Sequence, residues 1–202
     1  MSPPAWLPPS YHPLPRSFYR RDSREVAPEL LNKILVRADG RAGRIVETEA
    51  YCGSLDAAAH SYRGKTTRNA SMFADPGTMY VYFTYGMHWC ANAVCGEHGE
   101  GVAVLLRALQ PLTGLPLMRL ARSKARSDRD LCRGPARLCQ AFSIDRAFDG
   151  TDLVSGKDGL MMVDDGMAPP EAPLVGPRIG ISQATEFPWR WRLADSRWTS
   201  GR

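Results

Sequence analysis

Residues 77–92 read GTMYVYFTYGMHWCAN, and this stretch decides how the middle of the chain folds. The run Thr78–Thr84 is rich in Tyr, Val and Phe, which is typical of a strand. Tyr85-Gly86-Met87 follows as a turn, and His88–Val94 predicts the returning strand. The stretch therefore predicts a β-hairpin whose tip carries an aromatic residue.

Further strands are expected on both sides of this hairpin. Lys33–Arg37 and Gly43–Glu49 alternate, contain β-branched residues, and are joined by a turn at Ala38-Asp39-Gly40. After the loop Gly96–Gly101, Val102–Leu109 predicts another strand. Later short strands are expected at Leu160–Val163, Arg178–Ile181 and Arg190–Leu193.

Helical signals are fewer and lie between the strands. Asp22-x-x-Glu25 resembles a capping box that opens a helix reaching about Asn32, although Pro28 sits late in it. Pro135–Phe142 predicts a second helix, and Ala57–His60 a short one. We expect an α+β fold: a single domain over residues 16–202 with a largely antiparallel sheet, peripheral helices and a protruding β-hairpin. Residues 1–15, rich in proline, are expected to form an extended arm.

Length and composition limit the class of protein. A chain of 202 residues suits one well-buried domain. No apolar run approaches the roughly 20 residues of a membrane span, and the start of the chain does not resemble a signal peptide. Five cysteines with no common zinc spacing indicate reduced thiols in a cytoplasmic protein. We predict no metal site and no cofactor.

The net charge of +5 is unevenly distributed. The run Arg119–Arg137 holds seven basic and two acidic residues, and the segment His60–Ser71 adds Arg63, Lys65 and Arg68 without an acid. Each run alone is compatible with a solvated surface. Two runs flanking an aromatic hairpin favour contact with nucleic-acid phosphates.

Residues 44–60, RIVETEAYCGSLDAAAH, contain the candidate for chemistry. Glu49 ends an apolar strand, where a carboxylate can reach a cleft and take a proton from water, or can serve as a structural ion-pair partner. Glu47 is expected on the opposite, solvent-facing side. Arg107 ends another apolar run and is either a partner of Glu49 and its water or an exposed strand-end residue. Cys52 is more consistent with packing than with a catalytic thiol.

Aromatic residues cluster close to this acid. Tyr80 and Tyr82 share a strand face, where they could wall a pocket or pack in the core. Tyr85, at the hairpin tip, has little core to join and could wedge into a nucleic-acid stack in place of an extruded base. His60 is a candidate ligand-binding residue or a structural histidine.

With these residues in view, the sequence resembles the alkyladenine (3-methyladenine, methylpurine) DNA glycosylase family, as a bacterial member. The resemblance runs from about Leu14 to the C-terminus. The motifs that carry it occur in one order: VETEAY at 46–51, AAAHS at 57–61, TRNASMF at 67–73, PGTMYVYFTYGMHWCAN at 76–92, VLLRAL at 104–109, GPARLCQAFSID at 134–145 and RIGIS at 178–182. His88 after Met87 and the length of the loop Val94–Gly101 depart from the family pattern.

The resemblance implies a DNA repair enzyme that flips an alkylated or deaminated purine and hydrolyses its N-glycosidic bond. It implies Glu49 as general base and Arg107 as a second catalytic residue that holds the water. The implied base-binding residues are Tyr51, Ala58, His60, Tyr82 and Asn92. The resemblance also assigns intercalation to Tyr85 and Met87, and Arg63, Lys65 and Arg68 are expected on the DNA backbone.

Two other readings stay open at this point. A non-catalytic nucleic-acid-binding module would share the basic segments and the tyrosines but would not need Glu49. A glycosylase with lyase activity would need an amine nucleophile, and the four lysines lack pocket-like contexts. The expected partner is double-stranded DNA containing a damaged purine, bound by a monomer without membrane association, in the cytoplasm and at the nucleoid in a bacterium.

Overall fold

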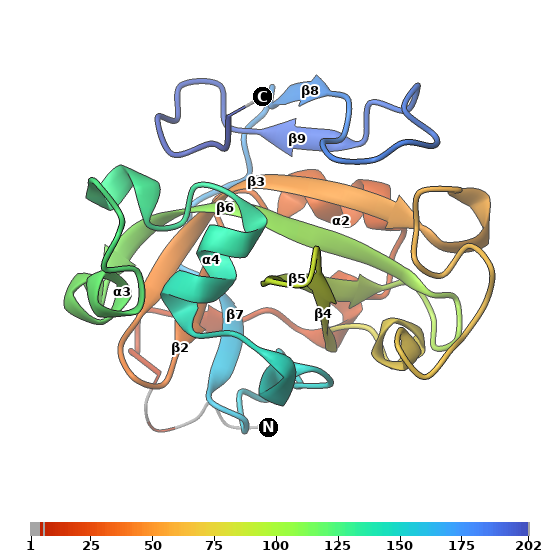
Figure 1. Ribbon diagram of the computed structural model, residues 1–202. Helices are drawn as coiled ribbons and strands as arrows, with labels where there is room; N and C mark the ends of the chain where they lie inside the picture. The colour runs from red at the N-terminus through yellow and green to blue at the C-terminus, as the bar shows by residue number, and fades with distance from the viewer. Residues whose placement is uncertain (1–4, 6, 202) are drawn as a thin grey trace.

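The computed structural model describes residue 5 and residues 7–201 (Figure 1). Over these residues the chain forms a nine-stranded sheet in which every strand pair is antiparallel. The main path of the sheet runs β1 (His12–Pro13), β7 (Leu160–Asp164), β2 (Ile34–Arg37), β3 (Ala42–Cys52), β6 (Val102–Thr113), β5 (His88–Cys95) and β4 (Met79–Thr84). The expected α+β fold with a largely antiparallel sheet is confirmed.

Strand β3 is the centre of this arrangement. Along one edge it pairs with β6 over most of its length. Its other edge is shared, because β2 pairs with Ala42–Arg44 and β9 (Arg190–Arg192) pairs with Glu47–Glu49. Strand β8 (Leu174–Gly176) pairs with β9 and lies at the top of Figure 1, near the C-terminus. The acidic part of β3 is therefore enclosed by strands on both edges.

The helices are α1 (Arg16–Tyr19), α2 (Ser23–Glu29), α3 (Leu115–Ala121) and α4 (Pro135–Phe142). Helix α2 contacts β3 and buries Val26 and Ala27, whereas α4 contacts β5 and buries Leu138 and Phe142. These side chains join one apolar cluster with the inner residues of the strands. The packed helices hold the sheet rigid beside the site described below.

Helix α2 begins as predicted and ends earlier than predicted. The Asp22 side chain accepts a hydrogen bond from the backbone N–H of Arg24 at 2.8 Å, which confirms the N-cap. The helix stops at Glu29 because Asn32 adopts a left-handed φ of 71° and its N–H donates to Ile45 of β3. The chain thus leaves the helix in order to start the sheet. Helix α4 has the predicted bounds.

Two other predicted elements are wrong. The segment 57–60 forms turns, and the nearest helix is a 3-10 turn at Gly53–Leu55. The Asp56 side chain accepts the N–H of Ala58, and such local bonding competes with a helix. Arg178–Ile181 is irregular, since the N–H of Ile179 donates to a side chain of β3 and not to a neighbouring strand.

The segment before α1 is packed against the sheet where it is described. Leu7 and Leu14 are buried, and β1 pairs with β7 through His12 and Pro13. Residues 1–4 and 6 of the expected arm lie outside the described residues. Part of the proline-rich start therefore covers an edge of the sheet.

Candidate active site

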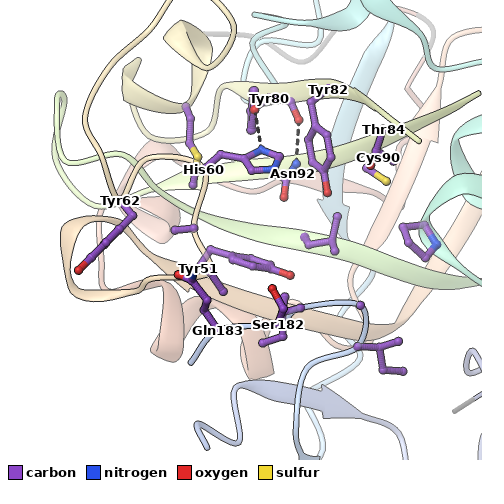
Figure 2. A pocket seen from close by; sticks show the side chains of 18 of the residues that line it. Tyr51, His60, Tyr62, Tyr80, Tyr82, Thr84, Cys90, Asn92, Ser182 and Gln183 are labelled. Carbon is purple, nitrogen blue, oxygen red and sulfur yellow. Dashed lines mark hydrogen bonds between the residues drawn. The ribbon is translucent and has the colours of Figure 1, made fainter. Parts of the chain in front are cut away.

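A cavity of about 640 Å³ opens beside β3, β4, β5 and β6. Figure 2 shows Tyr51 on one side of it and His60, Tyr80 and Tyr82 on the other. Two loops complete the wall, 57–63 and 179–183. The volume lies within the range of small-molecule pockets. The cavity therefore has room for a planar ligand between opposed rings.

The rings of one wall are fixed by contact with each other. Tyr80 and Tyr82 are stacked with ring centroids 5.5 Å apart, as their spacing on one strand face predicts. The imidazole of His60 meets the Tyr82 ring edge-on at 4.4 Å, and its Nδ1 lies 3.0 Å from the Tyr80 hydroxyl. Burial raises the pKa of Tyr80 to about 12, so its hydroxyl keeps its proton near neutral pH.

Glu49 is fully buried and does not itself line the cavity, but its contacts are with residues that do. Its Oε1 accepts the N–H of Ile179 at 2.7 Å and lies 3.0 Å from Nη1 of Arg107. Its Oε2 accepts the Tyr51 hydroxyl at 3.0 Å. Burial raises the pKa of Glu49, although Arg107 and the two hydrogen bonds favour the ionised form. All three residues that contact the carboxylate line the cavity.

A β-bulge directs Arg107 toward this carboxylate. Ala108 of β6 pairs with Glu47 and Leu106 pairs with Thr48, so Arg107 is the extra residue between two pairs. An extra residue in a strand changes the direction of its side chain. The guanidinium of Arg107 is thereby placed between Glu47 and Glu49, at 3.0 Å from an oxygen of each. Of the two alternatives for Arg107, a partner of Glu49 and an exposed strand-end residue, the geometry shows the ion-pair partner.

The expectation that Glu47 faces solvent is wrong. Residues two apart on a strand share a face, so Glu47 lies on the same side as Glu49 and is fully buried. Its carboxylate accepts hydrogen bonds from Arg107 and Arg190, and Ser200 donates through both its N–H and its hydroxyl. Glu47 therefore holds the C-terminal segment against β3.

Three further expected pocket residues lie at the cavity. Asn92 is buried and its side-chain amide donates to the Tyr80 carbonyl at 3.1 Å, which orients the side chain. The N–H of Ala58 is occupied by Asp56 at 3.0 Å, so a ligand could use only the Ala58 carbonyl. With Nδ1 of His60 near Tyr80, Nε2 is the ring nitrogen left for a ligand. The structure brings together Tyr51, Ala58, His60, Tyr82, Asn92 and Arg107.

The tip of the β4–β5 hairpin projects apolar side chains into solvent. Tyr85 is 78% exposed and Met87 67% exposed. Tyr85 and Gly86 have positive φ values of 51° and 67°, and the N–H of Met87 donates to Thr84. A tyrosine with positive φ is uncommon and costs more than glycine would at this position. The tip therefore carries a side chain that folding alone does not favour.

Comparison with known proteins agrees with this geometry. Residues 17–197 match the family described as methylpurine-DNA glycosylase (MPG). The chain belongs to the methylpurine-DNA glycosylase family.

Curated relatives extend this match over most of the chain. A protein of Burkholderia cenocepacia (strain HI2424), named "Putative 3-methyladenine DNA glycosylase", is 63% identical over 93% of this chain and 91% of its own length. A relative with the same name in Koribacter versatilis is 47% identical over 94% of this chain and 94% of its own length. Another in Streptomyces avermitilis is 46% identical over 91% of this chain and 88% of its own length. The family is one of DNA repair enzymes that act in base excision repair.

The two basic segments differ in the contacts of their side chains. Arg63, Lys65 and Arg68 are exposed on the loop beside the cavity, and Arg68 also donates to the carbonyl of Phe83 in the hairpin. In the run 119–137, by contrast, most arginines bond within the protein. Their partners are Asp128 for Arg119, Leu131 for Arg122, Arg197 for Arg129, Thr199 for Arg133 and Asp130 for Arg137.

Several cavity residues were not expected from the sequence. The loop 179–183 contributes Ile179, Gly180, Ile181, Ser182 and Gln183 to the wall. The preceding Arg178 forms a fully buried ion pair with Asp56. An arginine directly before the apolar residues of the RIGIS motif was the available signal, because a charge in such a context needs a partner.

Other chemistry finds little support in the described residues. The five cysteines are free and buried, and burial raises the pKa of Cys52 away from that of a reactive thiol. Within residue 5 and residues 7–201, no group of three or more His, Cys, Asp or Glu side chains could hold a metal ion. No described helix is long and apolar enough to span a membrane.

Proposed function

We propose that this methylpurine-DNA glycosylase flips an alkylated or deaminated purine out of duplex DNA and hydrolyses its N-glycosidic bond. The attacking water is activated by Glu49, and the product is an abasic site. One observation carries the proposal: a fully buried carboxylate is held by Arg107, Ile179 and Tyr51, and all three of these residues line a cavity walled by tyrosines.

The hydrogen bonds of Glu49 define where a water can bind. Oε1 accepts one hydrogen bond, from the N–H of Ile179, and forms an ion pair with Arg107, whereas Oε2 accepts the Tyr51 hydroxyl. A carboxylate oxygen accepts two hydrogen bonds. Oε2 therefore keeps one acceptor position, which we assign to a water that enters from the cavity, and we assign to Arg107, which lines the cavity, the holding of that water. The carboxylate takes a proton from the water while the oxygen of that water forms a bond to C1′ of the sugar.

The leaving base takes the electron pair of the breaking C1′–N bond. Cleavage at this carbon passes through an oxocarbenium-like state, which the negative charge of Glu49 stabilises. An alkylated purine already carries positive charge and leaves as a neutral base. For such a cationic purine one carboxylate is sufficient, whereas a deaminated purine is neutral and takes up a proton from solvent as it leaves.

The aromatic walls account for binding of the flipped base. Tyr51 and Tyr82 face the cavity from opposite sides, so a purine between them would be stacked on both faces (Figure 2). Nε2 of His60 and the oriented side chain of Asn92 offer polar contacts at the edge of the base. Asn92 would disfavour guanine, because the exocyclic amine of guanine would lie against the Asn92 side chain.

The hairpin tip suits the act of flipping. Tyr85 and Met87 are exposed beside the cavity mouth, and Tyr85 itself lines the cavity. An inserted ring would fill the space left by the flipped nucleotide. Extrusion costs a few kcal/mol and less for a damaged pair, which contributes to the choice of lesion.

The test is excision from defined duplexes. Duplexes containing 3-methyladenine, 7-methylguanine, hypoxanthine or ethenoadenine are incubated with the protein, and hot alkali then converts abasic sites into strand breaks. We expect breaks at one or more lesions after alkali, and none before it because no amine nucleophile acts. A protein that binds these duplexes and excises none of the bases would be a binding module instead.

A further inference from the structure

Arg178 and Asp56 form an ion pair whose side chains are both fully buried next to the cavity. Nη2 of Arg178 donates to Oδ1 of Asp56 at 2.8 Å, and Nη1 donates to Oδ2 and to the carbonyl of Ala50. The guanidinium also lies 4.7 Å from the centre of the Tyr51 ring. This pair is not part of the proposed chemistry, yet it touches the residues that carry it.

Three parts of the site converge on this pair. The residue after Arg178 is Ile179, whose N–H donates to Oε1 of Glu49. Tyr51, which lies against the guanidinium, donates its hydroxyl to Oε2 of the same carboxylate. Asp56 accepts the N–H of Ala58 and thereby shapes the loop that leads to His60. The pair thus connects Glu49, the ring of Tyr51 and the loop that leads to His60.

Burying two charged side chains in a protein interior costs desolvation free energy. Desolvation offsets much of the attraction between them, and apolar side chains of similar volume stabilise a fold as well or better. What the pair offers is geometry, because a guanidinium and a carboxylate in bidentate contact have a defined relative orientation. Side chains that orient reacting groups can change rates strongly when they shift by about 1 Å.

We propose that the Asp56–Arg178 pair is a positioning unit that holds the Ile179 N–H and the Tyr51 hydroxyl on the two oxygens of Glu49. The inference rests on the proposed function, since it concerns how that carboxylate is oriented. Arg178 does not touch the reacting atoms. It sets the direction of the Glu49 acceptor position that a water would use.

The test compares Arg178→Lys with a matched control, Arg44→Lys. Arg44 lies on β3, the strand that carries Glu49; its side chain is 12% exposed and pairs with Asp165 at 2.6 Å, and it does not line the cavity. Lysine keeps the charge and loses the fork and the flat contact with Tyr51. We expect the single-turnover excision rate at saturating enzyme to fall by about 100-fold in Arg178→Lys, the scale of a misplaced catalytic group, with half-saturation for DNA changed less than twofold. Arg44→Lys is expected to keep both values.

A pH profile separates positioning from a merely structural role. The groups around Glu49 are Tyr51 and Glu47 from β3, Arg107 from β6, Cys90 from β5 and Arg178 from its loop. Loss of the donors that Arg178 positions would disfavour the ionised carboxylate, so the acid limb of the excision rate is expected to move to higher pH. A structural role alone would lower the melting temperature and leave the limb in place.

A second variant removes a single hydrogen bond. Replacing the Ile179 amide with an ester deletes its N–H and leaves every side chain, including the ion pair, intact. We expect a loss of at least about 10-fold in rate, as for a hydrogen bond to a charged group, and the same upward move of the acid limb. The inference is overturned if either folded variant retains the wild-type rate and acid limb. If wild-type protein excises no lesion, the proposed function fails instead.

Discussion

Glu47 and Glu49 lie two residues apart on β3, are fully buried, and share Arg107, yet their surroundings differ. Glu47 receives hydrogen bonds from Arg107, Arg190 and Ser200, four in all. Two cations and the C-terminal segment therefore satisfy it. Glu49 receives fewer contacts, and each comes from a residue that lines the cavity.

The difference shows that burial and an arginine partner do not by themselves identify a catalytic acid. Three of the four hydrogen bonds to Glu47 come from Arg190 and Ser200, which do not line the cavity, so this carboxylate stabilises the fold. Glu49 is contacted by Tyr51, Arg107 and Ile179, which all line the cavity, so a ligand bound there would lie closer to it than to Glu47. A similar difference separates the internally bonded arginines of 119–137 from the exposed Arg63 and Lys65.

The largest expected effect is on the Glu49 side of the comparison. Glu49→Gln keeps the shape and removes the proton acceptor, so the single-turnover excision rate should fall by about 10²–10⁴ with DNA binding retained. The raised pKa of Glu49 means that its ionised form is less favourable in the folded than in the unfolded chain. Its contribution to stability is thus present at low pH and lost as pH rises through the folded pKa.

Two measurements test the raised pKa of Glu49. The melting temperature of Glu49→Gln at pH 7 to 8 should be no lower than that of the wild type. The wild-type excision rate should decline on acidification at a pH above the range of an ordinary glutamate. Glu171→Gln, at an exposed position, serves as the control. Near-normal excision by Glu49→Gln would end the assignment of the general base.

Glu47→Gln tests the structural role of the second carboxylate in this comparison. Removing this charge leaves Arg107 and Arg190 without their shared anion, and breaking a buried pair on one side costs about 3–5 kcal/mol of unfolding free energy. Urea unfolding should show this loss. Excision by the folded fraction, measured well below the transition, should fall less than tenfold. A full loss of excision with unchanged stability would reverse the roles of the two carboxylates.

Tyr85 extends the comparison to a residue that the fold does not need. Tyr85→Gly should weaken the flipped state by about 1–3 kcal/mol, the scale of base–aromatic stacking. The melting temperature should stay the same or rise, because glycine accepts the φ of 51° without strain. A fluorescent base analogue beside the lesion reports flipping. Leu120→Ala, equally exposed at 78%, is the control and should change neither quantity.

The smallest effects concern the exposed basic loop. Lys65→Ala and Arg63→Ala should each reduce the slope of log K against log salt by about 0.9 if each side chain neutralises one phosphate. Lesion and undamaged duplexes should be affected alike. Arg119→Ala, which breaks an exposed pair with Asp128, is expected to leave the slope unchanged. Unchanged slopes for all variants would remove the loop from the DNA-binding surface.

Much of the fold could be predicted because its signals are local. The β4–β5 hairpin follows from alternating aromatic residues around a glycine turn, and α4 has its predicted bounds because Pro135 starts it. The predictions failed where a distant partner decided the backbone. Ile179 donates to Glu49 and so leaves no strand at 178–181, and Asn32 turns out of α2 to pair with β3.

The sequence by itself determined the longer strands, the hairpin tip and rings on one face, because these depend on residues close together in the chain. Glu49, which was expected to end its strand, lies within β3, because that strand continues to Cys52. The tertiary structure decided which carboxylate is contacted by cavity residues and which is held by the C-terminal segment. Residues 49, 107, 179 and 200 meet only through the β6 bulge and the return of the C-terminal segment to β3. Hydrogen-bond satisfaction of a buried charge depends on all its neighbours in space, and no local pattern contains them.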